Sequence, residues 1–361
     1  MPSTRPWINH NEHGACNACE NAEAKKRNID WKARWKELEK ICDKYRSKGD
    51  TFDCIVPCSG GKDGSIVAWK LKHEMGMHPL CITLAPQLPT KIGIENLHNF
   101  INSGFDHLLI TPNPQNEKKI ALFGMTEQGR PRLSTVLGQT TALVNAAVKF
   151  KIPLIVYGEE GHSEYGGVTH MGTKSHFTKE ERIQLYFSGN DPDKIAEKIG
   201  IKRKDLPWMR FPTLQELQSV GILWLHWSYF EKWNQYEHYL LAKRHCEFKT
   251  LPQRSIGTYT NFAQLDDDMQ DLHVYFMFLK FGFGRTTSDA CIDVRRGALD
   301  RKQALALVRR YDGEYPESLI PHFLDYFSMT KEQFDSIIDK WANREVLTKV
   351  NGIWKLKELP S

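Results

Sequence analysis

The sequence has no long hydrophobic run. None of its apolar stretches approaches the ~18 residues that a membrane-spanning helix needs, and residues 1–11 lack the apolar core of a signal peptide. Strong charge of one sign is also missing, because the net charge is +5 and 26% of the residues are charged. This mildly basic balance suits anionic small molecules and does not by itself indicate nucleic acid. We therefore expect a cytoplasmic protein that contacts no membrane.

Cysteine is present without the pattern of a disulfide framework. Three of the eight cysteines, Cys54, Cys58 and Cys81, lie in or beside apolar strand-like runs, as core thiols of cytosolic proteins do. Only Cys16 and Cys19 have the spacing of metal ligands, and such a pair is half of a tetrahedral zinc site. The pair can bind zinc or remain as two free thiols, and the spacing leaves both open.

Strand-like and helix-like patterns alternate in the first half of the chain. The apolar runs predict strands at 52–57, 80–84, 106–111 and 153–157, and the intervening patterns predict helices after residue 65, at 92–101 and at 136–150. This alternation predicts an α/β fold, with a parallel sheet and helices on both faces. Ligands bind to such sheets at the carboxyl ends of the strands.

The two ends of the chain have other patterns. Residues 1–30 are polar and irregular, while 31–47 have the periodicity of an amphipathic helix. After about residue 170 the alternation is lost. A helical pattern over 266–281, capping boxes that begin at Asp300 and Thr330, and a hairpin turn at 351–352 predict a mostly helical C-terminal part.

A glycine-rich turn follows the first predicted strand directly. Residues 59–65 read Ser-Gly-Gly-Lys-Asp-Gly-Ser, and the start of the next helix offers unpaired N–H groups and a favourable dipole to an anion. Lys62 can neutralise phosphate charge, and Asp63 can cap the helix or hold Mg²⁺. We expect an ATP site that includes Ser59, Gly60, Gly61, Lys62, Asp63, Gly64 and Ser65 from this turn and Gly158 from the end of the last predicted strand.

Two other glycine-rich motifs do not match. The turn is no Walker A loop, because Val56 and Asp63 occupy positions where that motif needs Gly and Ser or Thr. Residues 281–287 lack the third glycine and the setting of a dinucleotide fingerprint. The glycine-rich segment at 281–287 is therefore no nucleotide motif of its own, and residues 59–65 are the candidate phosphate-binding turn.

Further polar residues are candidates for the site. Glu159 ends a predicted strand and can position Mg²⁺ or ammonium, or be a solvated loop carboxylate. Lys280 and Arg285 flank a glycine-rich turn, which favours binding of an anionic sugar or pyrophosphate over a surface ion pair, and Arg295 is a similar candidate. Three sets stay open: His162, His170 and His176 as a lid or a surface loop, Asp266–Asp268 as metal ligands or a helix start, and the tryptophans of 224–233 as core or sugar-stacking residues.

The sequence Ser-Gly-Gly-x-Asp after an apolar strand resembles the PP-loop ATP pyrophosphatases. The resemblance implies ATP as substrate with Mg²⁺, cleavage between the α and β phosphates, and transfer of AMP to a substrate oxygen. Lys62, Asp63 and Glu159 are the implied catalytic residues. In the family a Ser follows the Asp directly, whereas here Gly64 lies between Asp63 and Ser65.

Several segments resemble the N-acetyl sugar amidotransferases of bacterial surface-polysaccharide and nonulosonic-acid biosynthesis. These segments are 14–19, 52–54, 59–65, 93–97, 158–159, 280–285, 295–297 and 311–313. The resemblance implies that the acetamido oxygen of an N-acetyl sugar is adenylated and that ammonia then displaces AMP, which yields an acetamidino sugar. The family also carries a second Cys pair before a segment like 1–6, and this sequence does not contain it.

The chain has no recognisable glutaminase motif. The string at 14–18, Gly-Ala-Cys-Asn-Ala, lacks the last glycine of Gly-x-Cys-x-Gly, and the first residues are Met1 and Pro2. We therefore expect ammonia from a separate protein. The resemblance implies a glutaminase partner like the glutaminase–cyclase pair of histidine biosynthesis.

Two other functions remain as alternatives. One is a tRNA-modifying PP-loop enzyme, for thiolation or lysidine-type ligation, which the basic balance and the terminal hairpin after a helix favour, although no Lys/Arg stripe argues for RNA. The other is a non-catalytic nucleotide-binding module, against which Lys62 and Asp63 argue. We predict three segments: 1–48 with the Cys pair and a helix, an ATP-binding domain at 49–200, and a substrate- or partner-binding region at 201–361.

Overall fold

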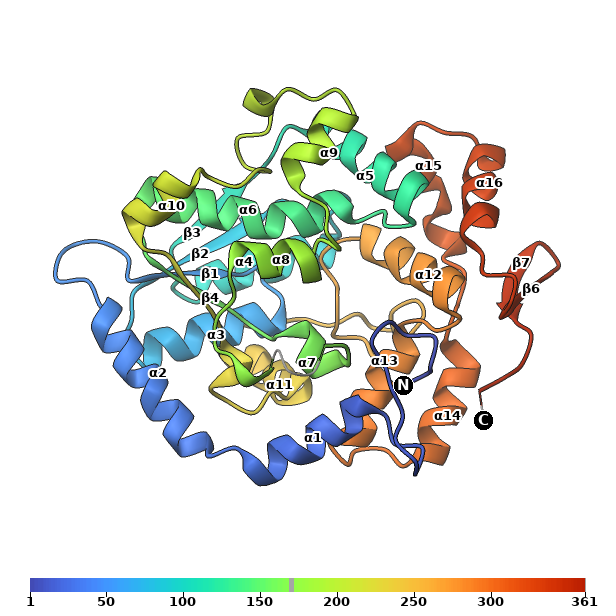
Figure 1. The fold of residues 1–361 in the computed structure, drawn as a ribbon, viewed down its shortest axis with the longest axis horizontal. Helices are drawn as coiled ribbons and strands as arrows, with labels where there is room; N and C mark the ends of the chain where they lie inside the picture. The colour runs from blue at the N-terminus through green and yellow to red at the C-terminus, as the bar shows by residue number, and fades with distance from the viewer. Residues whose placement is uncertain (169–171, 361) are drawn as a thin grey trace.

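The computed structural model describes residues 1–168 and 172–360. A five-stranded parallel sheet lies between two layers of helices, and a mostly helical C-terminal part packs beside it (Figure 1). The strand order is β3-β2-β1-β4-β5. The strands are β1 Cys54–Pro57, β2 Pro79–Leu84, β3 His107–Ile110, β4 Leu154–Tyr157 and β5 Leu223–His226. The predicted α/β fold is therefore confirmed.

The central strands β1 and β4 are apolar because both faces of the sheet are buried there, whereas the edge strand β3 is partly exposed. Ile55, Ile82 and Ile155 belong to one core, which α6 (Leu133–Phe150) covers. Val56 and Val156 belong to the opposite core, with α2 (Trp31–Tyr45) and α3 (Lys62–His73). A sheet covered on both sides produces near-continuous apolar runs rather than alternation with polar residues.

Helices connect the strands, and four of those in the first two thirds of the chain were predicted. The structure confirms helices at 31–45, 62–73, 91–102 (α4) and 133–150. It corrects the prediction for residues 1–30, since Asn17–Asn28 form α1. It adds α5 Pro114–Gln128, α7 Gly161–Tyr165, α8 Lys179–Leu185, α9 Pro192–Lys198, α10 Leu214–Val220 and α11 Gln235–His245. The start of α5 has a local cause, since Asn113 caps it and Pro114 occupies its first turn.

The C-terminal part consists of five helices and a hairpin. These are α12 Met269–Phe281, α13 Arg285–Arg295, α14 Arg301–Tyr311, α15 Ile320–Phe327, α16 Lys331–Trp341, β6 Leu347–Val350 and β7 Ile353–Leu356. Both predicted capping boxes are present, at Asp300 and at Thr330. Phe276, Phe323 and Phe334 are fully buried and join α12, α15 and α16 into one core.

The sheet extends beyond the segment predicted as the ATP-binding domain. Strand β5 lies at 223–226, after the predicted boundary at 200, and pairs in parallel with β4. Helix α11 then packs against α3. At the other end of the chain, α1 lies beside α7 and α13 (Figure 1). All three predicted segments therefore contact the region around the carboxyl ends of the strands. In the described part of the chain, no helix is long and apolar enough to cross a membrane.

Candidate functional site

The glycine-rich turn joins β1 to α3, as the sequence predicts. Gly60 has a φ of 77°, and a Cβ at this position would lie 2.4 Å from the backbone nitrogen of Leu97 in α4. Only glycine fits a turn that combines a positive φ with so close an approach to another backbone. The turn therefore presents bare backbone at the end of β1, where α3 begins.

A different steric constraint explains the glycine at position 64. A Cβ there would lie 2.6 Å from the carbonyl oxygen of Pro57, so the first turn of α3 packs directly against the end of β1. The next residue, Ser65, has no exposed surface, and its Oγ lies 3.5 Å from the Sγ of Cys58. Contrary to our prediction, the Ser65 hydroxyl lines neither of the cavities at the turn.

Two adjoining cavities open at the carboxyl ends of the strands. The first has a volume of about 300 Å³, and the second, beside it, of about 280 Å³. Both share Ser59, Asp63, Gly64, Arg132, Gln139, Glu159 and Asp266. Gly60, Gly61, Lys62, Tyr165 and Arg285 line the first alone, whereas Gly158 and the apolar Ile82, Leu84, Ala142, Leu143 and Tyr157 line the second alone. The first cavity is therefore polar and charged, whereas the second combines an apolar wall with the polar residues that both cavities share.

A buried charge network lies at the start of α3. Lys62 forms an ion pair with Asp63, and Nδ1 of His238, from α11, lies 3.0 Å from Oδ1 of Asp63. Burial raises the pKa of Asp63, but the charge of Lys62 and the hydrogen bond from His238 outweigh it, and the pKa falls to about 2. Asp63 is therefore a carboxylate at neutral pH, held by two groups and available at the cavity.

Glu159 reaches both cavities from the end of β4. The hydroxyl of Tyr165 donates a hydrogen bond of 3.0 Å to its carboxylate. Burial and the neighbouring charge of Asp63 raise the pKa of Glu159. The adjacent Glu160 is buried and caps α7, since it accepts hydrogen bonds from the backbone of His162 and Ser163. Of the two carboxylates, Glu159 can therefore act at the site, whereas Glu160 stabilises the start of α7.

The three cations predicted to bind substrate lie in three different places. Arg285, at the start of α13, lines the polar cavity and is paired with Asp289 at 2.9 Å. Lys280 does not line either cavity. It donates to the carbonyl of Gln128, and burial lowers its pKa to about 8. Arg295 lies outside both cavities and lines a third one of about 410 Å³.

The cysteine pair lies at the start of α1. The sulfurs of Cys16 and Cys19 are 3.6 Å apart, close to the ~3.8 Å expected for two thiolates on one tetrahedral zinc with Zn–S bonds of about 2.3 Å. A hydrogen bond from the Cys19 thiol lowers the pKa of Cys16 to about 4. Within the described residues, no group of three or more His, Cys, Asp or Glu side chains is arranged to hold a metal ion. The pair fits half of a zinc site.

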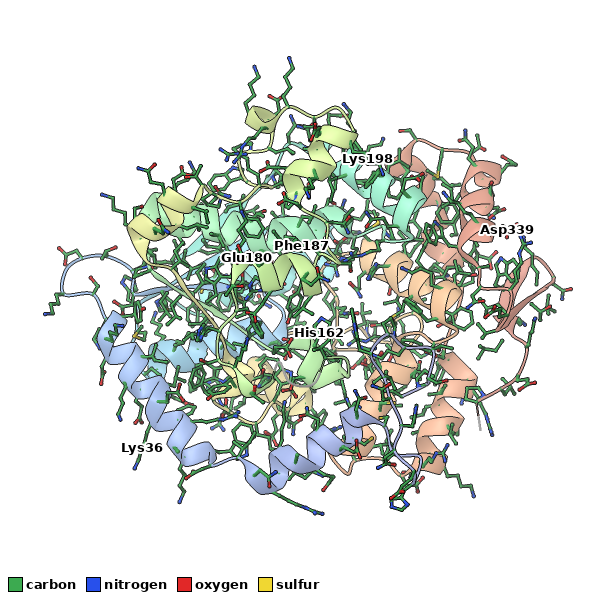
Figure 2. All side chains as sticks on the ribbon, in the orientation of Figure 1. Lys36, His162, Glu180, Phe187, Lys198 and Asp339 are labelled. Atoms are coloured by element: carbon green, nitrogen blue, oxygen red, sulfur yellow. The ribbon has the colours of Figure 1, made fainter. Side chains whose placement is uncertain are left out.

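The open histidine, aspartate and tryptophan sets now have positions. His162 lies on α7 near the centre of the view and contacts the ring of Trp7 (Figure 2), His176 lies beside Ser175, and His170 lies outside the described residues. Asp266 lines both cavities, Asp267 lines the second cavity and also accepts a hydrogen bond from the backbone of Met269, and Asp268 directly precedes α12. Among the tryptophans of 224–233, Trp224 and Trp227 are core residues, and Trp233 lines the third cavity.

Three residues of the site carry no local signal in the sequence. His238 contacts Asp63 across 175 positions, and Arg132 and Tyr165 line the polar cavity from α6 and α7. None of them belongs to a motif with fixed spacing. The strand–turn–helix unit and the two adjoining cavities together place bare backbone and cations, which suit an anion, at the carboxyl edge of the parallel sheet.

Comparisons with known proteins extend this assignment at the C-terminal end. Residues 256–359 match the family model described as LPS biosynthesis protein WbpG-like, C-terminal domain. An uncharacterised protein of Methanocaldococcus jannaschii, MJ1599, is 34% identical over 64 residues, which are 18% of this chain and 23% of that protein. This chain therefore spans about a quarter of that relative's length. The family match covers less than a third of the chain, so the similarity to a lipopolysaccharide biosynthesis domain concerns its C-terminal part.

A solved structure is also similar, at a low level. It is described as a predicted subunit of a tRNA methyltransferase from Methanocaldococcus jannaschii, with 18% sequence identity over 46% of this chain and 74% of that chain. The TM-score is 0.24, which is too low to support any argument about function.

Proposed function

We propose that the protein is an ATP-dependent, AMP-forming amidotransferase that converts the acetamido group of an N-acetyl sugar into an acetamidino group. One observation carries the proposal: Arg285 belongs to the segment that matches a lipopolysaccharide biosynthesis domain, and it lines the same cavity as Lys62 of the glycine-rich turn. A domain of sugar biosynthesis and a phosphate-binding turn thus contribute to one site.

The two cavities suit the two halves of ATP. The polar cavity offers bare backbone at Gly60 and Gly61 together with the cations Lys62 and Arg285, which are the features that bind phosphates. The adjoining cavity has apolar walls between β2 and α6, which suit an adenine ring. We propose phosphates in the first and the base in the second.

Asp63 lines both cavities and is the proposed protein ligand of Mg²⁺. Within the described residues no three carboxylates are arranged to hold a metal ion by themselves, and Mg²⁺ in nucleotide sites usually takes one or two carboxylates together with phosphate oxygens of the substrate. Asp63 stays ionised because Lys62 and His238 lower its pKa. When bound, Mg²⁺ supplies positive charge at the phosphates. Asp63 is the proposed ligand that is ready at neutral pH.

The reaction has two steps, a substitution at the α-phosphorus of ATP and then a substitution at the carbon of the activated acetamido group. The acetamido oxygen attacks the α-phosphorus of ATP, the bond from the α-phosphorus to the bridging oxygen breaks, and pyrophosphate leaves. Ammonia then adds to the imidate carbon, loses a proton, and AMP leaves with its oxygen, which yields the amidine. Lys62 and Arg285 stabilise the charge on the leaving pyrophosphate. Glu159, with its raised pKa, is the proposed acceptor of the proton from the adding nitrogen.

Ammonia, zinc and location complete the proposal. The ammonia comes from a separate glutaminase partner, like that of the histidine-biosynthesis glutaminase–cyclase pair. Cys16 and Cys19 contribute two ligands to a structural zinc site. Because the reaction consumes ATP, we propose that it takes place in the cytoplasm.

The test measures pyrophosphate release by the full chain. The assay contains ATP, Mg²⁺, ammonium and a panel of N-acetyl sugars, with mass spectrometry for the exchange of O for NH. We expect release that depends on both the sugar and ammonium, and we expect Lys62→Ala to abolish it. Lys280→Gln, which removes a cation outside both cavities, is the matched control. Release that depends on tRNA instead of a sugar would contradict the proposal in favour of an RNA-modifying enzyme.

A further inference from the structure

A third cavity, with Trp233 in its lining, shares no lining residue with the two cavities at the glycine-rich turn. We call it the basic cavity, after the residues that line it from α1, the start of α2, the loop before α11, and α13: Lys25, Lys26, Trp31, Lys232, Trp233 and Arg295. Its volume is about 410 Å³, within the range of about 300–1,000 Å³ that is usual for small-molecule sites. It is separate from the two cavities assigned to ATP.

The charge of the basic cavity is strongly one-sided. Five cations line it, with Arg296 as the fifth, against the single carboxylate of Glu164, which is paired with Lys25. Among the ion pairs of the described residues, none involves Lys232 or Arg295. Lys26 and Arg296 are paired with Glu23 and Asp293. Lys232 and Arg295 are therefore the cations of the lining that have no carboxylate partner among the described residues, and they are placed to attract an anion.

Two buried donors in the lining lack an acceptor. They are Nη1 of Arg295 and Nε1 of Trp233, and a buried donor without a partner carries a free-energy cost that a ligand oxygen would remove. The other terminal nitrogen of Arg295 donates to the carbonyl of Glu164 at 2.8 Å, which fixes the side chain. Trp31 and Trp233 add flat apolar surface, so the lining combines ring contacts with anion contacts.

The basic cavity is connected to the catalytic carboxylate through hydrogen bonds. Gln235, in its lining, donates to the hydroxyl of Tyr165 at 2.8 Å, and that hydroxyl donates to Glu159 at 3.0 Å. Trp233 also contacts the ring of His238, the partner of Asp63, with ring centroids 4.3 Å apart. A ligand in the basic cavity thus lies one or two side chains from the reacting groups.

We propose that the basic cavity binds the anionic part of the sugar substrate, while the acetamido group reaches Glu159 past Tyr165. This inference rests on the proposed function and narrows its substrate to sugars that carry a carboxylate or a phosphate ester. Both anions present oxygens that suit the guanidinium of Arg295 and the free indole N–H of Trp233. A neutral N-acetylhexosamine leaves both donors without a charged acceptor.

The experiment is titration calorimetry of the full chain without ATP or ammonium. The probes are N-acetylneuraminic acid for the carboxylate, UDP-N-acetylglucosamine for the phosphate ester, and N-acetylglucosamine as the neutral sugar. We expect one anionic probe to bind about tenfold or more tightly than the neutral sugar, as one charge-assisted hydrogen bond warrants. The probe that binds identifies the source of the anion. Equal binding of all three, or no heat from either anionic probe, would overturn the inference.

Variants locate the binding. Arg295→Gln should weaken the anionic probe about tenfold or more, and Lys232→Gln, an exposed position, serves if the first variant fails to fold. Lys36→Gln is the matched control, because Lys36 is exposed on α2 at the edge of the molecule (Figure 2). Wild-type affinity in both cavity variants would refute the site. Binding that is intact without any amidation would refute the proposed reaction instead, since the titration requires no turnover.

Discussion

The substitution Gly64→Ala has two effects of opposite sign on the free energy of unfolding. Gly64 lies in the first turn of α3 with an ordinary helical φ, so helix propensity alone predicts a gain of about 1 kcal/mol for alanine. A Cβ there would lie 2.6 Å from the carbonyl oxygen of Pro57 and 3.0 Å from the Cα of Cys58. Both are backbone atoms of the end of β1 and the turn, and they cannot rotate away as a side chain could.

Overpacking of this kind costs about 1–3 kcal/mol, and we expect it to exceed the gain in propensity. The free energy of unfolding should therefore fall by up to about 2 kcal/mol. The affinity for ATP should fall with it, because α3 must shift where its N–H groups face the cavity. The assays are denaturant unfolding and nucleotide titration. Gly49→Ala, at an exposed position with no atom within 4 Å of the new Cβ, is the control and should be neutral or slightly stabilising.

The opposite sign would refute this reasoning. If Gly64→Ala is more stable than the parent and binds ATP equally well, then α3 does not pack against β1 as closely as Gly64 indicates. The substitution Gly64→Ser, which restores the residue typical of PP-loop sequences, should behave like alanine for the same steric reason. If both variants are destabilised, the packing of α3 against β1 explains why this chain has glycine after Asp63 where PP-loop sequences have serine.

Three further predictions concern single groups. Arg285→Gln should weaken ATP binding about tenfold or more, because a charge-assisted contact is lost, while Lys280→Gln should leave it unchanged. Equal effects of the two substitutions in nucleotide titration would contradict the different positions of the two cations. The pKa of Asp63 is lowered from 3.8 to about 2, so the stability that its charge contributes is present above about pH 4 and is lost as the pH falls toward 2. In acid unfolding, the difference in free energy of unfolding between the parent and Asp63→Asn should therefore shrink over that interval, and a constant difference would contradict the lowered pKa. Cys16→Ser should lower the zinc content found by elemental analysis, as the 3.6 Å separation of the sulfurs suggests, whereas Cys291→Ser should not; unchanged zinc in both would exclude the pair as ligands.

The sequence predicts those parts of the fold that local pattern determines. Four strands were predictable because each is a continuous apolar run next to a turn, and the glycine-rich turn could be recognised because strand, glycines and helix are contiguous. Strand β5 was missed because its four residues lie inside a tryptophan-rich segment without clear strand boundaries. Its place beside β4 depends on pairing across about 70 positions, which no local pattern records.

The residues of the candidate site can likewise be divided into those that local sequence predicts and those that depend on tertiary packing. Lys62 and Asp63 are adjacent in the sequence and lie together, whereas the approach of His238 to Asp63 depends on the packing of α11 against α3. Lys280 and Arg285 flank one turn, yet they separate because Gly282, with a φ of 70°, ends α12 before α13 begins. Lys280 remains with the end of α12, and only Arg285 reaches the cavity.

The site therefore cannot be assigned to the segment 49–200 by itself. That segment contains the turn and Glu159, but His238 and Arg285 come from α11 and α13. The ionisation of Asp63 depends on His238 as well as on its neighbour Lys62. The charge around the turn consequently depends on helices from the second half of the chain. The segment that matches a lipopolysaccharide biosynthesis domain contributes a cation, Arg285, to the same cavity. If ATP and a sugar both bind, the acceptor and the phosphates meet only where these segments pack together.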